Sequence, residues 1–88
     1  MEFKKSTRKN KKYMVRYNTN SKWIHFGDLN YQQYMDKTPL KLYAYLDHKD
    51  KQRRDDYLKR AMGIKDKNGN LTYNNKNSPN YFSIKYLW

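Results

Sequence analysis

Cysteine is absent from the 88 residues of this chain, and glycine, proline and acidic residues are few. Without cysteine, no disulfide can stabilise the fold and no thiolate can bind zinc. The three glycines form no glycine-rich loop that could hold a phosphate. No apolar run approaches the roughly 18 residues of a membrane span, so we expect no membrane partner. These absences predict one small domain that is stabilised by noncovalent packing alone.

The scarcity of acidic residues leaves a strong positive charge. Eight Asp and Glu stand against twenty Lys and Arg, which gives a net charge of +12. An excess of this size in a short chain is typical of proteins that bind the phosphates of DNA or RNA. An acidic protein is the other partner that such a charge would attract. An AT-rich genome, which favours lysine codons, would explain part of the excess without any function.

Aromatic residues supply much of the apolar surface. Ten Tyr, three Phe and two Trp make up 17% of the chain, whereas all hydrophobic residues together reach only 36%. Each ring can bury a large area while the tyrosine hydroxyl keeps a polar partner. We therefore expect an aromatic core of modest size.

The amino-terminal segment is dominated by cations. Residues 4–12 contain six Lys and Arg and no acid. Because like charges repel and such a block buries little, the sequence predicts a basic disordered arm over residues 1–11 and a folded domain over residues 12–88. The alternative to phosphate binding by this block is a solvated tail that only aids solubility. Its candidate phosphate-binding residues are Lys4, Lys5, Arg8, Lys9, Lys11 and Lys12.

The residues after this arm predict a β-hairpin. Positions 13–17 alternate with a period of two and favour β-structure, Thr19 to Ser21 have turn chemistry, and positions 23–26 return as a second strand. Farther along, Tyr31, Tyr34 and Met35 have the spacing of one helical turn. Together with the helices described next, the hairpin predicts a small α+β fold.

Two further helices have marked starts. Thr38-Pro39 predicts a short helix over residues 39–46, since proline suits the first helical position. Ser78-Pro79 predicts a second start by the same rule. The residues 81–88 that follow are rich in aromatic side chains, and we expect them to pack in the core rather than to stack on bases.

The stretch from Asp47 to Gly63 has the clearest helical period in the chain. Asp47 can cap its amino end and Gly63 follows its last apolar residue, which predicts a central helix over about residues 48–62. One face of this helix is cationic, and a solvated face with acid–base pairs is the alternative interpretation. The candidate phosphate-binding residues on this face are Lys49, Arg53 and Arg60, with Asp56 beside them. The stripe expected to face the core is Arg54, Tyr57, Leu58, Ala61 and Met62.

The residues needed for catalysis are sparse. Glu2 is the only glutamate, and the aspartates fall in predicted caps, turns and helix positions. His25 and His48 are 23 residues apart and show no nucleophile–base motif. We therefore predict no catalytic residue, no metal ligand, no cofactor and no enzymatic activity.

Three ordered segments resemble a group of short, basic proteins of unknown function encoded by nucleocytoplasmic large DNA viruses. The resemblance covers roughly residues 12–88, although Ala61 stands where the group tends to have histidine and Ile84 where it tends to have tryptophan. It implies a viral setting, in the virion or in the cytoplasm or nucleus of an infected cell, and it implies no activity. The segments are Phe26-Gly27 with Tyr31 and Tyr34, Asp47-His48 with Asp50, Arg53-Arg54, Tyr57 and Arg60, and Ser78-Pro79 with Tyr81-Phe82-Ser83 and Tyr86-Leu87-Trp88.

Two functions of different kinds fit these observations. The first is non-catalytic nucleic-acid binding, through phosphate contacts of the arm and the helix face and without strong sequence preference. The alternative is a virion structural or adaptor protein whose basic surface binds an acidic protein partner. The sequence leaves open the choice between DNA and RNA and the oligomeric state.

Overall fold

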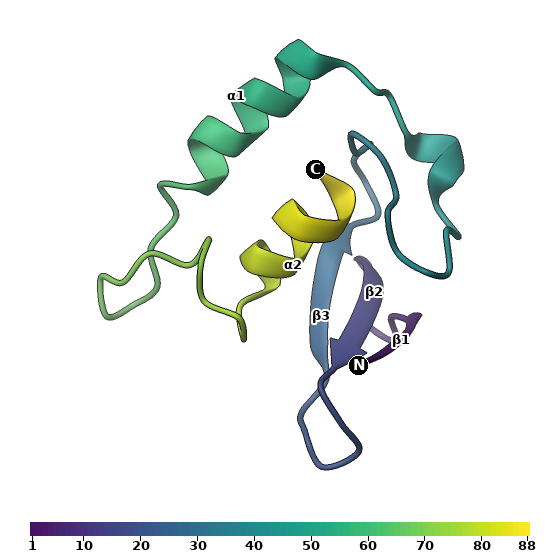
Figure 1. Cartoon of the computed structure of the whole chain (residues 1–88), viewed down its shortest axis with the longest axis vertical. Coiled ribbons are helices and arrows are strands. Elements are labelled where there is room, and N and C mark those ends of the chain that lie inside the picture. Colours follow the sequence, from purple (N-terminus) through teal and green to yellow (C-terminus); the bar gives the residue numbers. More distant parts are fainter.

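A three-stranded antiparallel sheet and two helices make up the computed structural model, which describes residues 1–88 (Figure 1). The strands are β1 (Glu2–Lys5), β2 (Lys11–Arg16) and β3 (Ile24–Asp28), in the order β1-β2-β3. A short 3₁₀ helix, η1 (Ala44–Leu46), precedes the helices α1 (Lys51–Ala61) and α2 (Pro79–Leu87). The predicted α+β fold is confirmed. None of the helices is long and apolar enough to span a bilayer.

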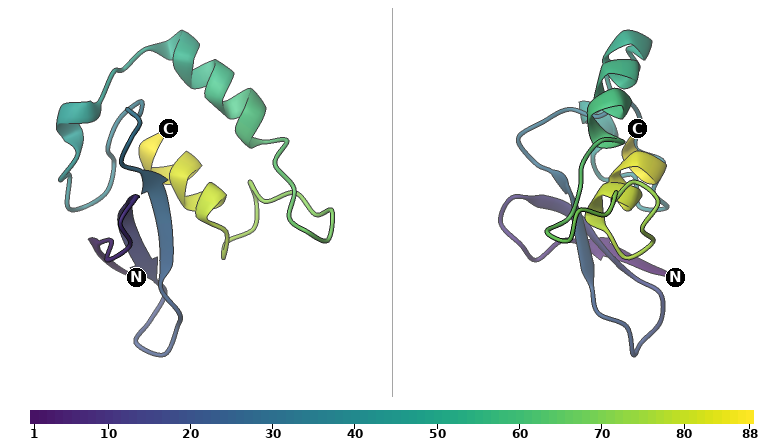
Figure 2. Two further views of the ribbon diagram at one scale, coloured as in Figure 1. Left: turned by 180° about the vertical axis from the view of Figure 1, so that it is seen from behind. Right: turned by 90° about the vertical axis from the view of Figure 1, so that its left-hand side faces the viewer.

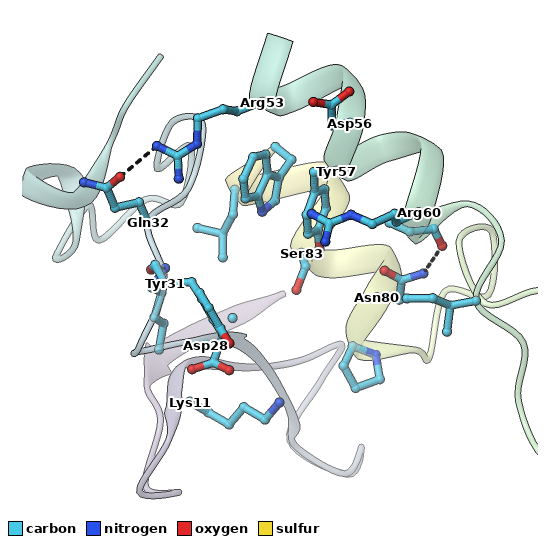
Figure 3. Close-up of a pocket in the computed structure, with 17 residues that line it drawn as sticks. Lys11, Asp28, Tyr31, Gln32, Arg53, Asp56, Tyr57, Arg60, Asn80 and Ser83 are labelled. Atoms are coloured by element: carbon cyan, nitrogen blue, oxygen red, sulfur yellow. Dashed lines mark hydrogen bonds between the residues drawn. The ribbon is translucent and has the colours of Figure 1, made fainter. Parts of the chain in front are cut away.

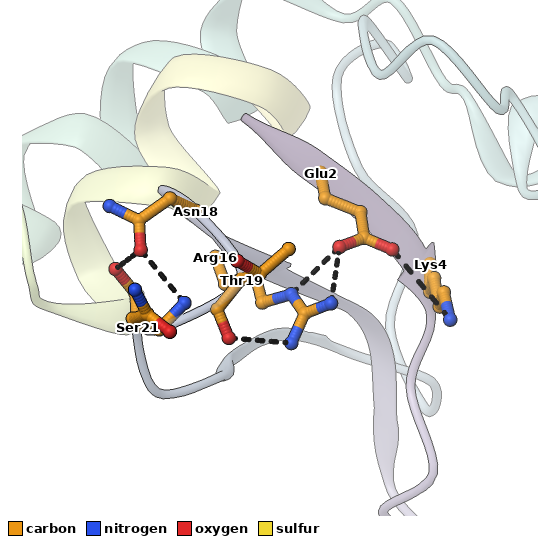
Figure 4. Close-up of polar contacts among 7 residues, drawn as sticks. Glu2, Lys4, Arg16, Asn18, Thr19 and Ser21 are labelled. Carbon is orange, nitrogen blue, oxygen red and sulfur yellow. Dashed lines mark hydrogen bonds and ion pairs between the residues drawn. The ribbon is translucent and has the colours of Figure 1, made fainter.

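The predicted hairpin is formed by β2 and β3. Tyr13 lies opposite Phe26 and Val15 opposite Ile24 in its register. In the connecting turn, the Asn18 side chain accepts hydrogen bonds from the backbone of Asn20 and from the hydroxyl of Ser21 (Figure 4). Because successive side chains of a strand point to opposite faces, Tyr13 and Val15 of β2 share one face of the sheet, the face that meets α2.

The core lies between the sheet and α2. Ser78 caps α2 by accepting from the backbone N–H of Asn80, and Pro79 occupies the first turn, as the sequence predicts. Phe82 of α2 packs 5.8 Å from Phe26, measured between ring centroids. The predicted aromatic core and the burial of the carboxy-terminal segment are confirmed. The buried cluster consists of Tyr13, Val15, Phe26, Tyr43, Phe82 and Leu87.

Gly27 allows β3 and α2 to approach this closely. Its φ of +79° lies in the left-handed region, where side chains with a Cβ are strained. A Cβ at this position would stand 2.8 Å from the side chain of Leu87 and 3.1 Å from that of Lys12. Glycine is therefore required here both for its backbone angle and for the space it leaves.

Residues 1–11 do not form the disordered arm that the sequence predicts. Glu2–Lys5 pairs with β2 as the edge strand β1. Phe3 packs edge-to-face on Tyr86 with 4.9 Å between the ring centroids, and the Glu2 carboxylate lies 2.7 Å from the Arg16 guanidinium (Figure 4). The prediction considered the cations and overlooked the one acid and the one phenylalanine before them. These two side chains give the segment something to bury and a partner for its charge.

The segment between β3 and α1 is a loop rather than two helical pieces. Only Ala44–Leu46 is helical, so the helix predicted over residues 39–46 and the turn at Tyr31 to Met35 are wrong. The buried Asp36 carboxylate holds this loop by accepting from the hydroxyls of Tyr13 and Thr38 and from the backbone N–H of Tyr43. These hydrogen bonds, of which one reaches Tyr13 of β2 and another takes up the nearby backbone N–H of Tyr43, compete with the helix that the local spacing predicts.

The central helix exists, but it is shorter and less central than predicted. Asp50 caps α1 by accepting from the backbone N–H groups of Gln52 and Arg53. Asp47, the predicted cap, instead accepts from the Gln33 side chain and from the backbone of Asp36. Helix α1 lies over α2 and away from the sheet (Figures 1 and 2). The chain is therefore organised around the sheet and α2.

Helix α1 is attached to α2 and to the carboxy-terminal residue. The ring of Tyr57 stacks on that of Trp88, with 4.0 Å between centroids and 6° between planes. Arg54 donates to the backbone carbonyl of Trp88, and Asn80 donates to that of Ala61. Ala61 is the one buried residue of the predicted inner stripe, whereas Met62 is exposed.

Candidate functional site

A groove of about 810 Å³ separates α1 from the sheet, with α2 at its base (Figure 3). One wall comes from α1, and the opposite wall comes from the start of β2 and from the end of β3 with the loop after it. Asp28 and Asp56 lie among its lining residues, so the groove is mixed in charge with an excess of cations. The polar and aromatic residues that line it include Lys11, Asp28, Tyr31, Gln32, Arg53, Asp56, Tyr57, Arg60, Asn80, Ser83 and Trp88.

Four of the predicted phosphate-binding residues line this groove: three are available to a ligand, and the fourth, Lys12, is buried. Arg53 and Arg60 come from α1, and Lys11 comes from β2. The guanidinium of Arg53 donates to the side-chain oxygen of Gln32, 2.9 Å away, and so connects the two walls (Figure 3). The only salt bridges in the molecule join Glu2 to Lys4 and to Arg16, so all three groove cations are without an acidic partner. Guanidinium and ammonium donors that line one groove can bind an anion such as a phosphate.

The other predicted cations lie elsewhere. Lys4 pairs with Glu2 and lies over the ring of Trp23. Lys49 precedes α1 in a left-handed backbone conformation and does not line the groove. Arg8 lines a second pocket of about 420 Å³, next to Trp23 and His25. Lys5 and Lys9 are exposed and line neither pocket. The predicted set is therefore not one continuous surface.

Lys12 is not a surface cation, and its assignment as a phosphate contact is wrong. Its side chain is only 1% exposed, and its ammonium group donates to the backbone carbonyl of Tyr31 at 2.8 Å and to the side-chain oxygen of Gln33. Burial lowers its pKa to about 8 against the opposing effect of nearby carboxylates. The central strand of the sheet is covered on both faces, and a charge count along the sequence does not show this.

Sequence reasoning missed the residues that complete the groove. Tyr31 is 68% exposed and lines it, although its spacing predicts a helical turn. Gln32 positions Arg53, and Asn80 ties the end of α1 to α2. These residues follow turns or lie in α2, and no local pattern marks them. Only the long-range packing of α1 brings them together.

A serine and a histidine approach each other outside the groove. The Ser6 hydroxyl lies 2.7 Å from Nδ1 of His25, and the Ser6 oxygen also accepts from the backbone N–H of Arg8. Burial and the charges of Arg8 and Lys11 lower the pKa of His25. No carboxylate contacts the other ring nitrogen, so the pair lacks the group that orients the imidazole in a catalytic triad. The chain contains no group of three or more His, Asp or Glu side chains that could hold a metal ion.

The fold and the groove thus define a small α+β protein with a groove beside α1 that has an excess of cations. Residues 1–42 match the model of a family described as a family of unknown function, DUF5754. This match includes all three strands and Tyr31, and it stops before α1 and α2. No curated protein and no solved structure matches the chain.

Proposed function

We propose that this chain binds nucleic acid through phosphate contacts in the groove between α1 and the sheet, without catalysis and without strong sequence preference. The observation that carries the proposal is that Lys11 of β2 and Arg53 and Arg60 of α1 line one groove, with no salt bridge to any of them. The net charge of +12 adds long-range attraction for a polyanion. The resemblance to proteins of large DNA viruses supports a viral genome or transcript as the partner, in the virion or the infected cell.

The geometry suits phosphate better than a single carboxylate ligand. A guanidinium presents several N–H donors in a plane and can bind a phosphate through two of them. Arg53 and Arg60 stand on one helix wall, seven residues apart, so they can contact successive phosphates of one backbone. Lys11 adds a point charge from the opposite wall. Such contacts fix the position of a strand and carry no base information.

An adaptor that binds an acidic protein is the second candidate. Its supporting observation is a group of exposed apolar side chains, Leu40 and Leu42 in the loop before η1 and Tyr45 within η1. Isolated exposed apolar residues are ordinary, but neighbours along one loop can dock a protein. In the carboxy-terminal segment, Phe82 and Leu87 are buried in the core and are not available for such docking.

A matched pair of double variants tests the proposal. We expect Arg53→Ala with Arg60→Ala to weaken binding to a fluorescently labelled oligonucleotide by about tenfold or more, since a hydrogen bond to a charged group contributes roughly 1.5–3 kcal/mol. The control is Lys51→Ala with Lys59→Ala, which removes the same charge from exposed positions of α1 outside the groove. Fluorescence anisotropy measures the affinity, and circular dichroism checks that α1 is retained. Equal losses for the two pairs would show that net charge, and not the groove, causes binding.

A further inference from the structure

The ring of Tyr31 is free while its backbone is held. The backbone N–H of Tyr31 donates to the carbonyl of Asp28, and its carbonyl accepts from the buried ammonium group of Lys12. The side chain is 68% exposed, and it makes no hydrogen bond and stacks on no other ring. In Figure 3 it points into the groove, between Arg53 and Lys11. A rigid backbone therefore presents an uncovered aromatic face among cations.

The other aromatic residues of the groove are already paired. Tyr57 and Trp88 stack on each other. Burial desolvates the Tyr57 hydroxyl and so raises its pKa. Tyr31 is thus the one groove ring with no aromatic neighbour. An exposed ring leaves apolar area in water at a cost of roughly 25 cal/mol per Å², and a flat apolar ligand would remove that cost.

Resting on the proposed function, we infer that the groove takes single-stranded rather than duplex nucleic acid, with one base stacked on Tyr31 while Arg53 and Arg60 contact the backbone. In a duplex, each base face is covered by the next base pair, so a ring on a groove wall cannot reach it. Unpaired bases can turn outward and stack on an aromatic side chain. The groove volume of about 810 Å³ lies within the roughly 300–1,000 Å³ of pockets that hold small ligands, which suits a short piece of one strand.

Base stacking and phosphate contact can be separated with three probes. These are a thymidine oligonucleotide of about 12 nucleotides, the duplex that contains it, and an abasic strand of equal length that keeps the phosphates and lacks the bases. We expect the wild-type protein to bind the single strand more tightly than the duplex. Tyr31→Ala should weaken single-strand binding between about 5-fold and 150-fold, which is the equivalent of roughly 1–3 kcal/mol per stacked base. The same variant should leave binding to the abasic strand unchanged.

Two control variants make the result specific. Tyr31→Phe keeps the ring and should retain near wild-type affinity. Tyr45→Ala removes a ring that is 76% exposed but lies outside the groove, and it should have no effect. Because the Tyr31 side chain makes no hydrogen bond and no ring stacking, Tyr31→Ala should keep the fold, which a thermal melt checks.

The outcomes distinguish this inference from the function on which it rests. If Tyr31→Ala binds the single strand as well as the wild type does, base stacking at Tyr31 is refuted, although the Arg53 and Arg60 variants can still show phosphate binding. If the duplex is bound more tightly than the single strand, the preference for single strands is refuted in the same way. If the wild-type protein binds no probe more tightly than the Arg53→Ala with Arg60→Ala variant does, the proposed function fails together with the inference.

Discussion

At the residue scale, Lys12 lies in β2 with its ammonium group between the carbonyl of Tyr31 and the side chain of Gln33. Burial lowers the pKa of Lys12 to about 8, and the carboxylates of Asp28, Asp36 and Asp47 oppose this effect. No carboxylate forms a salt bridge with it. The protonated state is therefore less stable in the folded protein than in the unfolded chain.

This residue predicts a rise of stability with pH. Below pH 8 both states hold the proton, and burial of the charge lowers the free energy of unfolding. Between about pH 8 and 10.5, the ordinary pKa of a lysine, the folded state releases the proton before the unfolded chain does. The unfolded state then binds more protons, so the Lys12 contribution to the free energy of unfolding increases with pH, by at most about 1.4 kcal/mol per pH unit. Urea denaturation between pH 7 and pH 10 measures it.

The control for this prediction is Lys12→Met, which keeps the length of the side chain and removes the titration. The difference in slope between the two proteins isolates Lys12 from the other lysines. Equal pH dependence in both would contradict the buried, poorly compensated charge. Above pH 10 the trend should reverse, because burial and the hydrogen bond to Asp36 raise the pKa of Tyr13 to about 12. The unfolded chain then loses the tyrosine proton first, and the free energy of unfolding falls.

At the scale of secondary structure, local signals were enough where the tertiary structure agrees with them. The hairpin follows from alternating residues around a turn, and α2 follows from Ser78-Pro79. The cap of α1 was misplaced by three residues, because the Asp47 carboxylate binds Gln33 and the backbone of Asp36 instead. The helix predicted at residues 39–46 gives way to the hydrogen bonds of the Asp36 carboxylate, which accepts from the hydroxyl of Tyr13 in β2 and from the backbone N–H of Tyr43.

The same limit applies to the candidate site. Arg53 and Arg60 were predicted on one face of a helix, and they do line one groove. The sequence places Lys11 in a disordered arm, and only the pairing of β2 with β3 brings it across from them. Tyr31 had a helical spacing and no signal for exposure. Residue type can identify cations, but three-dimensional packing decides which of them share a surface.

The edge strand β1 carries the prediction that belongs to this scale. Deleting residues 1–5 should lower the free energy of unfolding by about 1–2 kcal/mol, because Phe3 packs on Tyr86 and is partly buried, and full burial of a phenylalanine is worth roughly 1.5–3 kcal/mol. Thermal or urea denaturation measures the change. The matched control is Lys4→Ser with Lys5→Ser, which removes the same two lysines and keeps Phe3. A truncated protein as stable as the wild type would restore the disordered arm that composition alone predicts.

At the scale of the whole molecule, the positive charge is distributed over several surfaces. Lys12 is buried, Lys4 pairs with Glu2, and Arg16 lies over the ring of Trp23 while it contacts the same carboxylate. Lys4 and Arg16 lie outside the groove, and Lys12 lines it with its side chain buried, so these cations add to the net charge of +12 without being available to a ligand there. The overall charge therefore attracts any polyanion, whereas the groove presents only Lys11, Arg53 and Arg60 for direct contact.

This distinction predicts how binding depends on salt. Each cation that contacts a phosphate releases a counterion, so the logarithm of the association constant falls linearly with the logarithm of the salt concentration. Three groove cations predict a slope of about −2 on single strands, at roughly 0.7 per phosphate.

Arg53→Ala with Arg60→Ala should flatten the slope to about −0.7, whereas Lys51→Ala with Lys59→Ala should leave it near −2. Anisotropy titrations between roughly 50 and 300 mM KCl measure the slopes. A competitor strand of scrambled sequence should displace the probe as well as the original strand does, because phosphate contacts carry no base information. Slopes that respond equally to both pairs of variants would assign the binding to net charge alone, and the adaptor would then be the better account of this protein.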